Sequence, residues 1–106
     1  MNESILQTLC GLKVSGARLV AGKAGISFEN GTTLAIFNRF TLTGIAPADA
    51  GLLVGEAVSG ICEAPNTISI EFGSRASIRI DMRDNAYTGP EAMELCSPGE
   101  PIAIWN

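Results

Sequence analysis

The sequence of 106 residues contains no histidine and few basic residues. Without histidine, the most common general base is missing, and so are the catalytic triads that are built on it. The 7 Lys and Arg residues are outnumbered by 11 Asp and Glu residues, which gives a formal net charge of −4. Because nucleic-acid binding needs a basic surface, this charge argues against nucleic acid as a partner.

Patterns typical of metal sites and of membrane segments are also missing. Cys10, Cys62 and Cys96 lie far apart, form no CxxC spacing and have no histidine to complete a common zinc site. We expect them to be reduced and to act as small buried apolar residues, with no metal or other cofactor. No apolar run approaches the roughly 20 residues of a membrane-spanning helix. Since Met1–Ser4 also lacks the features of a signal peptide, we expect a cytoplasmic protein without membrane contact.

The composition is that of a folded globular protein. Hydrophobic residues make up 46% of the chain and charged residues 17%, unlike the composition of a disordered segment. A chain of this length can build one modest hydrophobic core. We therefore expect a single domain over residues 1–106.

A β-hairpin is predicted around Asn30-Gly31, because two alternating apolar runs flank this pair and Asn-Gly is the strongest short-range hairpin motif. A two-residue turn would put the apolar residues of the two runs on opposite faces. A three-residue loop that ends with Gly31 in the left-handed conformation instead pairs Ile26 with Leu34. This longer loop keeps all the apolar residues on one face, so we predict it.

The same hairpin recurs 44 residues downstream. Between 3–39 and 47–83, nine of 37 positions are identical without a gap, and a spacing of this size is typical of an internal repeat. Each copy is predicted to hold a short helix, over 4–10 or 47–54, followed by a three-stranded β-meander. The predicted fold is α+β and mostly antiparallel β, with the two halves packed as a sandwich or a barrel-like core. The predicted core residues are Ile26, Phe28, Leu34, Ile36, Ile70, Phe72, Ile78 and Ile80.

The C-terminal part breaks the repeat and is predicted as a hairpin over 90–106. Pro98-Gly99 provides its turn, and Ile102–Trp105 would pair with Glu91–Cys96. Four segments stand out here: Met82-Arg83-Asp84, Gly89-Pro90-Glu91-Ala92, Ser97-Pro98-Gly99 and Ile102-Ala103-Ile104-Trp105-Asn106. They resemble the end of a family of small uncharacterised bacterial single-domain proteins. Because the family has the same glycine-led strand and phenylalanine hairpin upstream, the resemblance covers most of the chain. It implies a bacterial cytoplasmic source and an α+β fold, and it assigns no site.

The one dense group of polar residues lies around Asp81 and Arg83. Its carboxylates could bind a cation or act in acid–base chemistry, or an Arg–carboxylate pair could simply hold the end of a strand. Arg39 is equivalent to Arg83 in the repeat, so the two arginines could flank a groove for an anion, or bind backbone carbonyls at strand ends. The candidate ligand-binding residues are Arg39, Asp81, Arg83, Asp84 and Glu91.

Two predicted edge segments carry almost no charge, Phe37–Leu42 and Ile102–Trp105. Uncharged edges invite pairing with another chain, so we expect a homodimer with Phe37, Phe40 or Trp105 in the contact. Alternatively, the C-terminal strand covers the edge of the first sheet and leaves a monomer, with Trp105 as a lid on the core.

The leading functional hypothesis is a non-enzymatic protein-interaction module, similar to an immunity protein or an antitoxin, that binds another protein or itself. One alternative is a binder of small molecules or anions between the two copies, near Arg39 and Arg83. The other is a small enzyme that uses Asp81, Asp84 or Glu91, with or without a metal.

Overall fold

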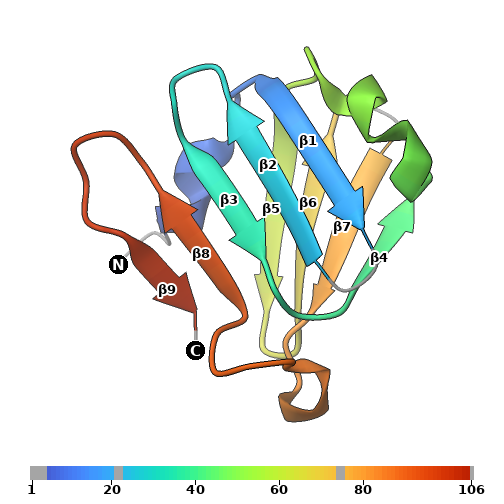
Figure 1. Cartoon of the computed structure of the whole chain (residues 1–106), viewed down its shortest axis with the longest axis vertical. Coiled ribbons are helices and arrows are strands. Elements are labelled where there is room, and N and C mark those ends of the chain that lie inside the picture. Colours follow the sequence, from blue (N-terminus) through green and yellow to red (C-terminus); the bar gives the residue numbers. More distant parts are fainter. Residues whose placement is uncertain (1–4, 21–22, 74–75, 106) are drawn as a thin grey trace.

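The computed structural model describes residues 5–20, 23–73 and 76–105, and in this part of the chain the structure is mostly antiparallel β. Two sheets are present, with the strand orders β1-β2-β3-β8-β9 and β4-β7-β6-β5, and they do not close into a barrel (Figure 1). The strands are β1 (Val14–Val20), β2 (Lys23–Phe28), β3 (Thr33–Ile36), β4 (Phe40–Thr43), β5 (Val58–Ala64), β6 (Thr67–Phe72), β7 (Ala76–Asp81), β8 (Met93–Cys96) and β9 (Ala103–Trp105).

The helical segments in these ranges are short 3₁₀ helices: η1 (Ile5–Leu9), η2 (Pro47–Leu53) and η3 (Asp84–Ala86). η1 and η2 lie where short helices were predicted, although Ser4, the predicted start of the first, lies outside the described residues. η2 begins at Pro47, a residue suited to a first helical turn, and Asp49 interrupts its helical geometry. The fold is thus closer to all-β than to the predicted α+β class. None of the helices in the described ranges is long and apolar enough to cross a membrane.

The first hairpin has the predicted register. Ile26 of β2 lies opposite Leu34 of β3, and Gly31 has a φ of +90°. The loop is closed by a bond of 3.0 Å from the Gly31 amide to the Phe28 carbonyl. In the second hairpin Ile70 lies opposite Ile78, as predicted, while residues 74 and 75 of its loop lie outside the described ranges.

The C-terminal hairpin is also confirmed, since Leu95 of β8 pairs with Ala103 of β9. The two predicted three-stranded meanders are present as β1-β2-β3 and β5-β6-β7, but each is part of a larger sheet because strands from elsewhere in the chain are added to it. β4 adds to the second sheet, where Leu42 lies opposite Ile78. β8 adds to the first sheet, where Leu95 lies opposite Leu34.

The segment that leads from the first sheet to the second is held by Asn38. This side chain is fully buried, and its Nδ2 donates a hydrogen bond of 2.8 Å to the Asp81 carbonyl at the end of β7. The Asn38 amide donates to the Ala92 carbonyl just before β8. Asn38 therefore ties the crossing chain to both sheets.

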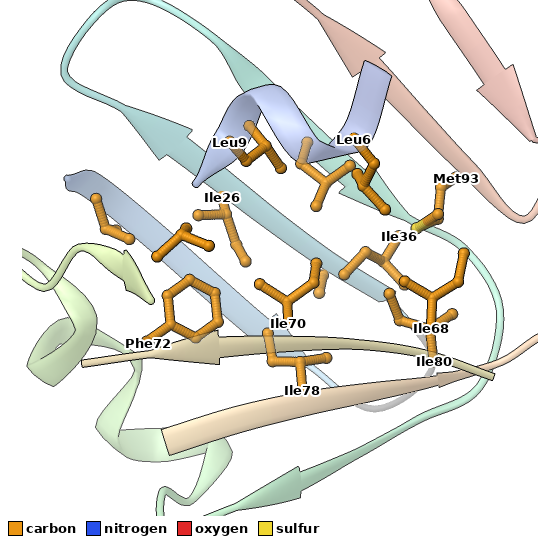
Figure 2. Packing of buried hydrophobic residues seen from close by; sticks show 14 of the residues in the cluster. Leu6, Leu9, Ile26, Ile36, Ile68, Ile70, Phe72, Ile78, Ile80 and Met93 are labelled. Carbon is orange, nitrogen blue, oxygen red and sulfur yellow. The ribbon is translucent and has the colours of Figure 1, made fainter. Parts of the chain in front are cut away.

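One hydrophobic cluster contains side chains from both sheets, and all eight predicted core residues belong to it. Figure 2 shows Leu6 and Leu9 of η1 in the same cluster as Ile78 and Ile80 of β7. The alternation of apolar and polar residues along the strands directs one face of each sheet to this core.

The three cysteines are free thiols, but the prediction that they are buried is wrong. Cys10 and Cys62 are exposed and Cys96 is half-buried. Cys62 lies opposite Ser69 on the polar face of its sheet, and Cys10 follows Leu9, which takes the core position. Neighbouring apolar side chains occupy the core, and the thiols lie outside it.

Two of the 3₁₀ helices, η1 and η2, lie along two of the four sheet edges. η2 packs along β1, and η1 packs along β5. The Gln7 side chain of η1 donates a hydrogen bond of 3.2 Å to the Ile61 carbonyl of β5. β4 and β9 are the other two edge strands.

Candidate binding surfaces

Asp81 and Arg83 form an ion pair at the end of β7. Arg83 Nη2 lies 2.7 Å from Asp81 Oδ2, and Arg83 Nε and the Arg83 amide each donate to Oδ1 at 3.0 Å. The side-chain bond from Arg83 lowers the pKa of Asp81 from 3.8 to about 2, and the backbone bond from the same residue adds to the effect. The carboxylate is therefore ionised at neutral pH, which makes Asp81 a poor proton donor or acceptor for catalysis there.

Arg39 lies just before β4 and binds backbone rather than a carboxylate. Its Nη2 donates to the Asn85 carbonyl at 3.1 Å, and its amide donates to the Ala86 carbonyl, both in η3. Its charge also contributes weakly to the low pKa of Asp81. The structure thus brings Arg39, Asp81 and Arg83 together, with Arg83 bound to the end of β7 and Arg39 bound to η3.

Asp84 and Glu91 do not join this group through any contact that the described residues make. Asp84 is exposed at the start of η3, where its carbonyl accepts a bond from the Tyr87 amide. Glu91 is half-buried in the segment that precedes β8. Across the ranges that the structure describes, no three or more acidic or cysteine side chains are placed to hold a metal ion.

Sequence reasoning did not single out Arg79, which lies at the centre of the polar face of the four-stranded sheet. It is exposed, with Ser69 of β6 opposite it on one side and Thr41 of β4 on the other. Strand alternation already placed Arg79 on this face, but Thr41 comes to lie beside it only because β4 crosses to this sheet.

Two open hollows flank Arg79. One, of about 450 Å³, is lined by Thr41, Asn66, Thr67, Arg79, Asp81 and Arg83, and the other, of about 250 Å³, by Thr41, Thr43, Ser69, Glu71, Ser77 and Arg79.

The outer edge of β4 is open among the described residues (Figure 1). In antiparallel pairs, residues bonded to the neighbouring strand alternate with residues whose backbone points away. The Asp81 amide donates to the Arg39 carbonyl at 3.0 Å, so position 39 is bonded toward β7. Phe40 and Leu42 then direct their N–H and C=O groups toward the open edge, and both side chains are half-buried.

The three predicted interface residues are all half-buried. Phe40 and Trp105 pack against the core, and Trp105 lies opposite Met93 on the inner side of β9. Phe37 follows β3, and its amide donates to the Ala92 carbonyl at 2.8 Å. This placement matches the alternative in which Trp105 covers the core, while contact with a second copy stays a prediction.

Comparison of this chain with protein-family models, with curated proteins and with solved structures found no match. The resemblance to a bacterial family stays an expectation from the sequence. Function is therefore inferred from the polar face and the open edge of the four-stranded sheet.

Proposed function

We propose that the protein is a non-enzymatic module that binds a polypeptide by adding it as a strand to the open edge of β4. The observation that carries this proposal is an asymmetry between two equivalent strands: β9 covers the outer edge of β8, whereas β4 is an edge strand. Binding of another protein in the manner of an immunity protein or an antitoxin, in the cytoplasm of a bacterium, fits this role. The equivalence of β4 and β8 rests on an internal duplication, packed as a sandwich.

Four features of the two halves support the duplication. β1 and β5 are 44 positions apart, as are β2 and β6. The bulge between Val14 and Gly16 in β1 recurs between Val58 and Gly60 in β5. Gly11 and Gly55, also 44 positions apart, have φ values of 89° and 90°. Such agreement in irregular features is expected of copies of one unit.

The contacts between the halves are reciprocal, as in a two-fold dimer. The Gly11 amide donates to the Val58 carbonyl at 2.8 Å, and the Gly55 amide donates to the Val14 carbonyl at 2.8 Å. Lys13 and Ala57, which are equivalent positions, bridge each other across the same junction. These contacts support a pseudo-two-fold axis through the junction, with each half giving its fourth strand to the other half's sheet.

The partners of β4 and β8 make these two strands equivalent. Phe40 lies opposite Ile80, and Met93 lies opposite Ile36, which is 44 positions before Ile80. Phe40 thus corresponds to Met93 and Leu42 to Leu95, with residues 84–92 as an insertion in the second half.

Burial of the equivalent side chains differs in the way that an open edge predicts. Met93 and Leu95 are 0% and 1% exposed beneath β9, whereas Phe40 and Leu42 are only half-buried. A strand added beside β4 would cover both side chains and bond the free backbone groups of the edge. By analogy with Trp105 and Ala103 of β9, it would place a large apolar residue opposite Phe40 and a small one opposite Leu42.

A labelled peptide with the sequence of residues 101–105, PIAIW, tests the proposal. By the same analogy, its second isoleucine lies opposite Thr41, an exposed residue of β4. We expect saturable binding by fluorescence anisotropy, and loss of binding when proline replaces the peptide's alanine. In Thr41→Glu, a peptide with lysine in place of that isoleucine should bind more tightly than one with glutamate, and Thr41→Lys should reverse the order. A peptide that does not bind, or a preference that ignores residue 41, would contradict the proposal.

Anion binding at Arg79 is a second candidate function, favoured by the position of this exposed guanidinium between two hydroxyl side chains. No described group pairs with Arg79, whereas Arg39 and Arg83 are both engaged. Titration with inorganic phosphate or citrate should shift the amide resonances of Thr41 and Ser69. Arg79→Gln should abolish these shifts, while Arg18→Gln, which alters an exposed arginine on the other sheet, should leave them unchanged.

A further inference from the structure

We infer that the strand added beside β4 is β4 of a second copy of the chain, which runs antiparallel with Thr41 opposite Thr41 across a two-fold axis. This inference rests on the proposed function, because it names the partner of the same open edge. The result is a continuous sheet in which the two four-stranded sheets meet at β4.

The backbone of β4 is suited to pairing with itself in this register. Phe40 and Leu42 direct their free N–H and C=O groups outward, and Thr41 lies between them. When Thr41 faces Thr41, the outward backbone groups of Phe40 meet those of Leu42 of the second copy. By symmetry, those of Leu42 meet the outward groups of Phe40 of the second copy. Each outward N–H then finds an outward C=O, so both residues of both copies are satisfied.

Registers shifted by two residues are less suitable because β4 is bounded on both sides. Gly44 has a φ of +78° and leaves the strand, so a register centred on Leu42 would lose its outer pairs. A register centred on Phe40 would need Asn38 to pair with the second copy, but Asn38 is fully buried and cannot reach the edge. Registers shifted by one residue would bring the apolar side chains opposite the threonines.

The side chains agree with this register. Phe40 and Leu42, both half-buried on the inner face, would cover each other across the axis. β4 itself is uncharged, and Arg39 would lie opposite Thr43 rather than opposite another arginine. A chain of net charge −4 thus meets its copy through a neutral strand.

Symmetry favours a second β4 over β9 as the occupant. If β4 paired with the open edge of β9 from another copy, the first copy would still have a free β9 edge and the second a free β4 edge. Assembly would therefore continue into a filament. Pairing of β4 with β4 uses the same residues on both copies and closes after two chains.

Sedimentation equilibrium on wild type and on charge variants of Thr41 tests the inference. Wild type should have twice the chain mass of 11.0 kDa. Thr41→Glu and Thr41→Lys should each raise the dissociation constant by more than about tenfold, because like charges then face each other across the axis. An equimolar mixture of the two variants should recover the dimer. Thr33→Glu, at an exposed threonine of the other sheet, and Ile104→Glu, at the edge strand β9, should leave the mass of the dimer unchanged.

The possible outcomes separate this inference from the proposed function. A monomer at high micromolar concentration that still binds the PIAIW peptide would reject the second copy and keep the strand-binding module. A monomer that binds no peptide would reject both. A dimer that tolerates both Thr41 variants, or one that Ile104→Glu dissociates, would refute pairing through β4.

Discussion

At the scale of single residues, the Asp81–Arg83 pair has the clearest physical consequence. Arg83 contacts both carboxylate oxygens of Asp81 and also donates its amide to one of them. The pair holds the end of β7 beside the Asn38 hydrogen bond that fixes the crossing chain. Because Arg83 is largely exposed, with 60% of its side chain accessible, we assign the pair a local role rather than a large share of stability.

The pH dependence of this pair is a first prediction. The folded-state pKa of Asp81, about 2, lies below its ordinary value of 3.8. Its stabilising contribution is therefore complete above about pH 5 and is lost as the pH falls through 4 toward 2. A carboxyl NMR titration should place the Asp81 midpoint near pH 2 in wild type. Arg83→Gln should move it most of the way to 3.8, and Arg39→Gln should move it less. An unchanged midpoint in Arg83→Gln would contradict the assignment.

At the scale of elements, the local pairings could be predicted from the sequence and the long-range pairings could not. Asn30-Gly31 and strand alternation were enough to fix the register of β2 and β3, because the turn and the buried face constrain it together. Nothing local indicates that β4, which follows β3 in the chain, joins the other sheet and pairs with β7. The sequence therefore identified Asp81 and Arg83, which are neighbours in the chain, but missed Thr41 beside Arg79.

The loop of the first hairpin gives a second prediction. Gly31 has a φ of +90°, and a Cβ at this position would lie 2.9 Å from Cγ of Pro98 in the β8–β9 turn. Gly99, with a φ of +77°, has nothing within 4 Å of such a Cβ. Gly99→Ala should lower the free energy of unfolding by about 1–2 kcal/mol through backbone strain alone.

Gly31→Ala should lower the same free energy by more than Gly99→Ala does, because it adds the contact with Pro98 to the strain. Adding Pro98→Ala to Gly31→Ala should recover part of the difference in urea denaturation. Equal losses in the two glycine variants, or no recovery in the double variant, would show that the two hairpin turns do not touch as described.

At the scale of the whole molecule, the two sheets share one core and should unfold together. Phe28 of β2 and Phe72 of β6 belong to the same hydrophobic cluster, one from each sheet. Phe28→Ala or Phe72→Ala should each lower the free energy of unfolding by about 3–5 kcal/mol. For a domain of this size the whole stability is about 5–15 kcal/mol, so either change removes a large part of it.

The test is whether a substitution in one sheet lowers the denaturation midpoint of the other sheet by the same amount. In Phe72→Ala, which alters the four-stranded sheet, the fluorescence of Trp105 in the five-stranded sheet should report the same denaturation midpoint as amide exchange in β7. In Phe28→Ala, which alters the five-stranded sheet, the two probes should again report one common midpoint. Leu52→Ala provides the control, because this side chain is 72% exposed and its loss should change stability by less than about 0.5 kcal/mol. Separate midpoints for the two sheets would mean that each sheet unfolds by itself, and that the shared core does not couple them.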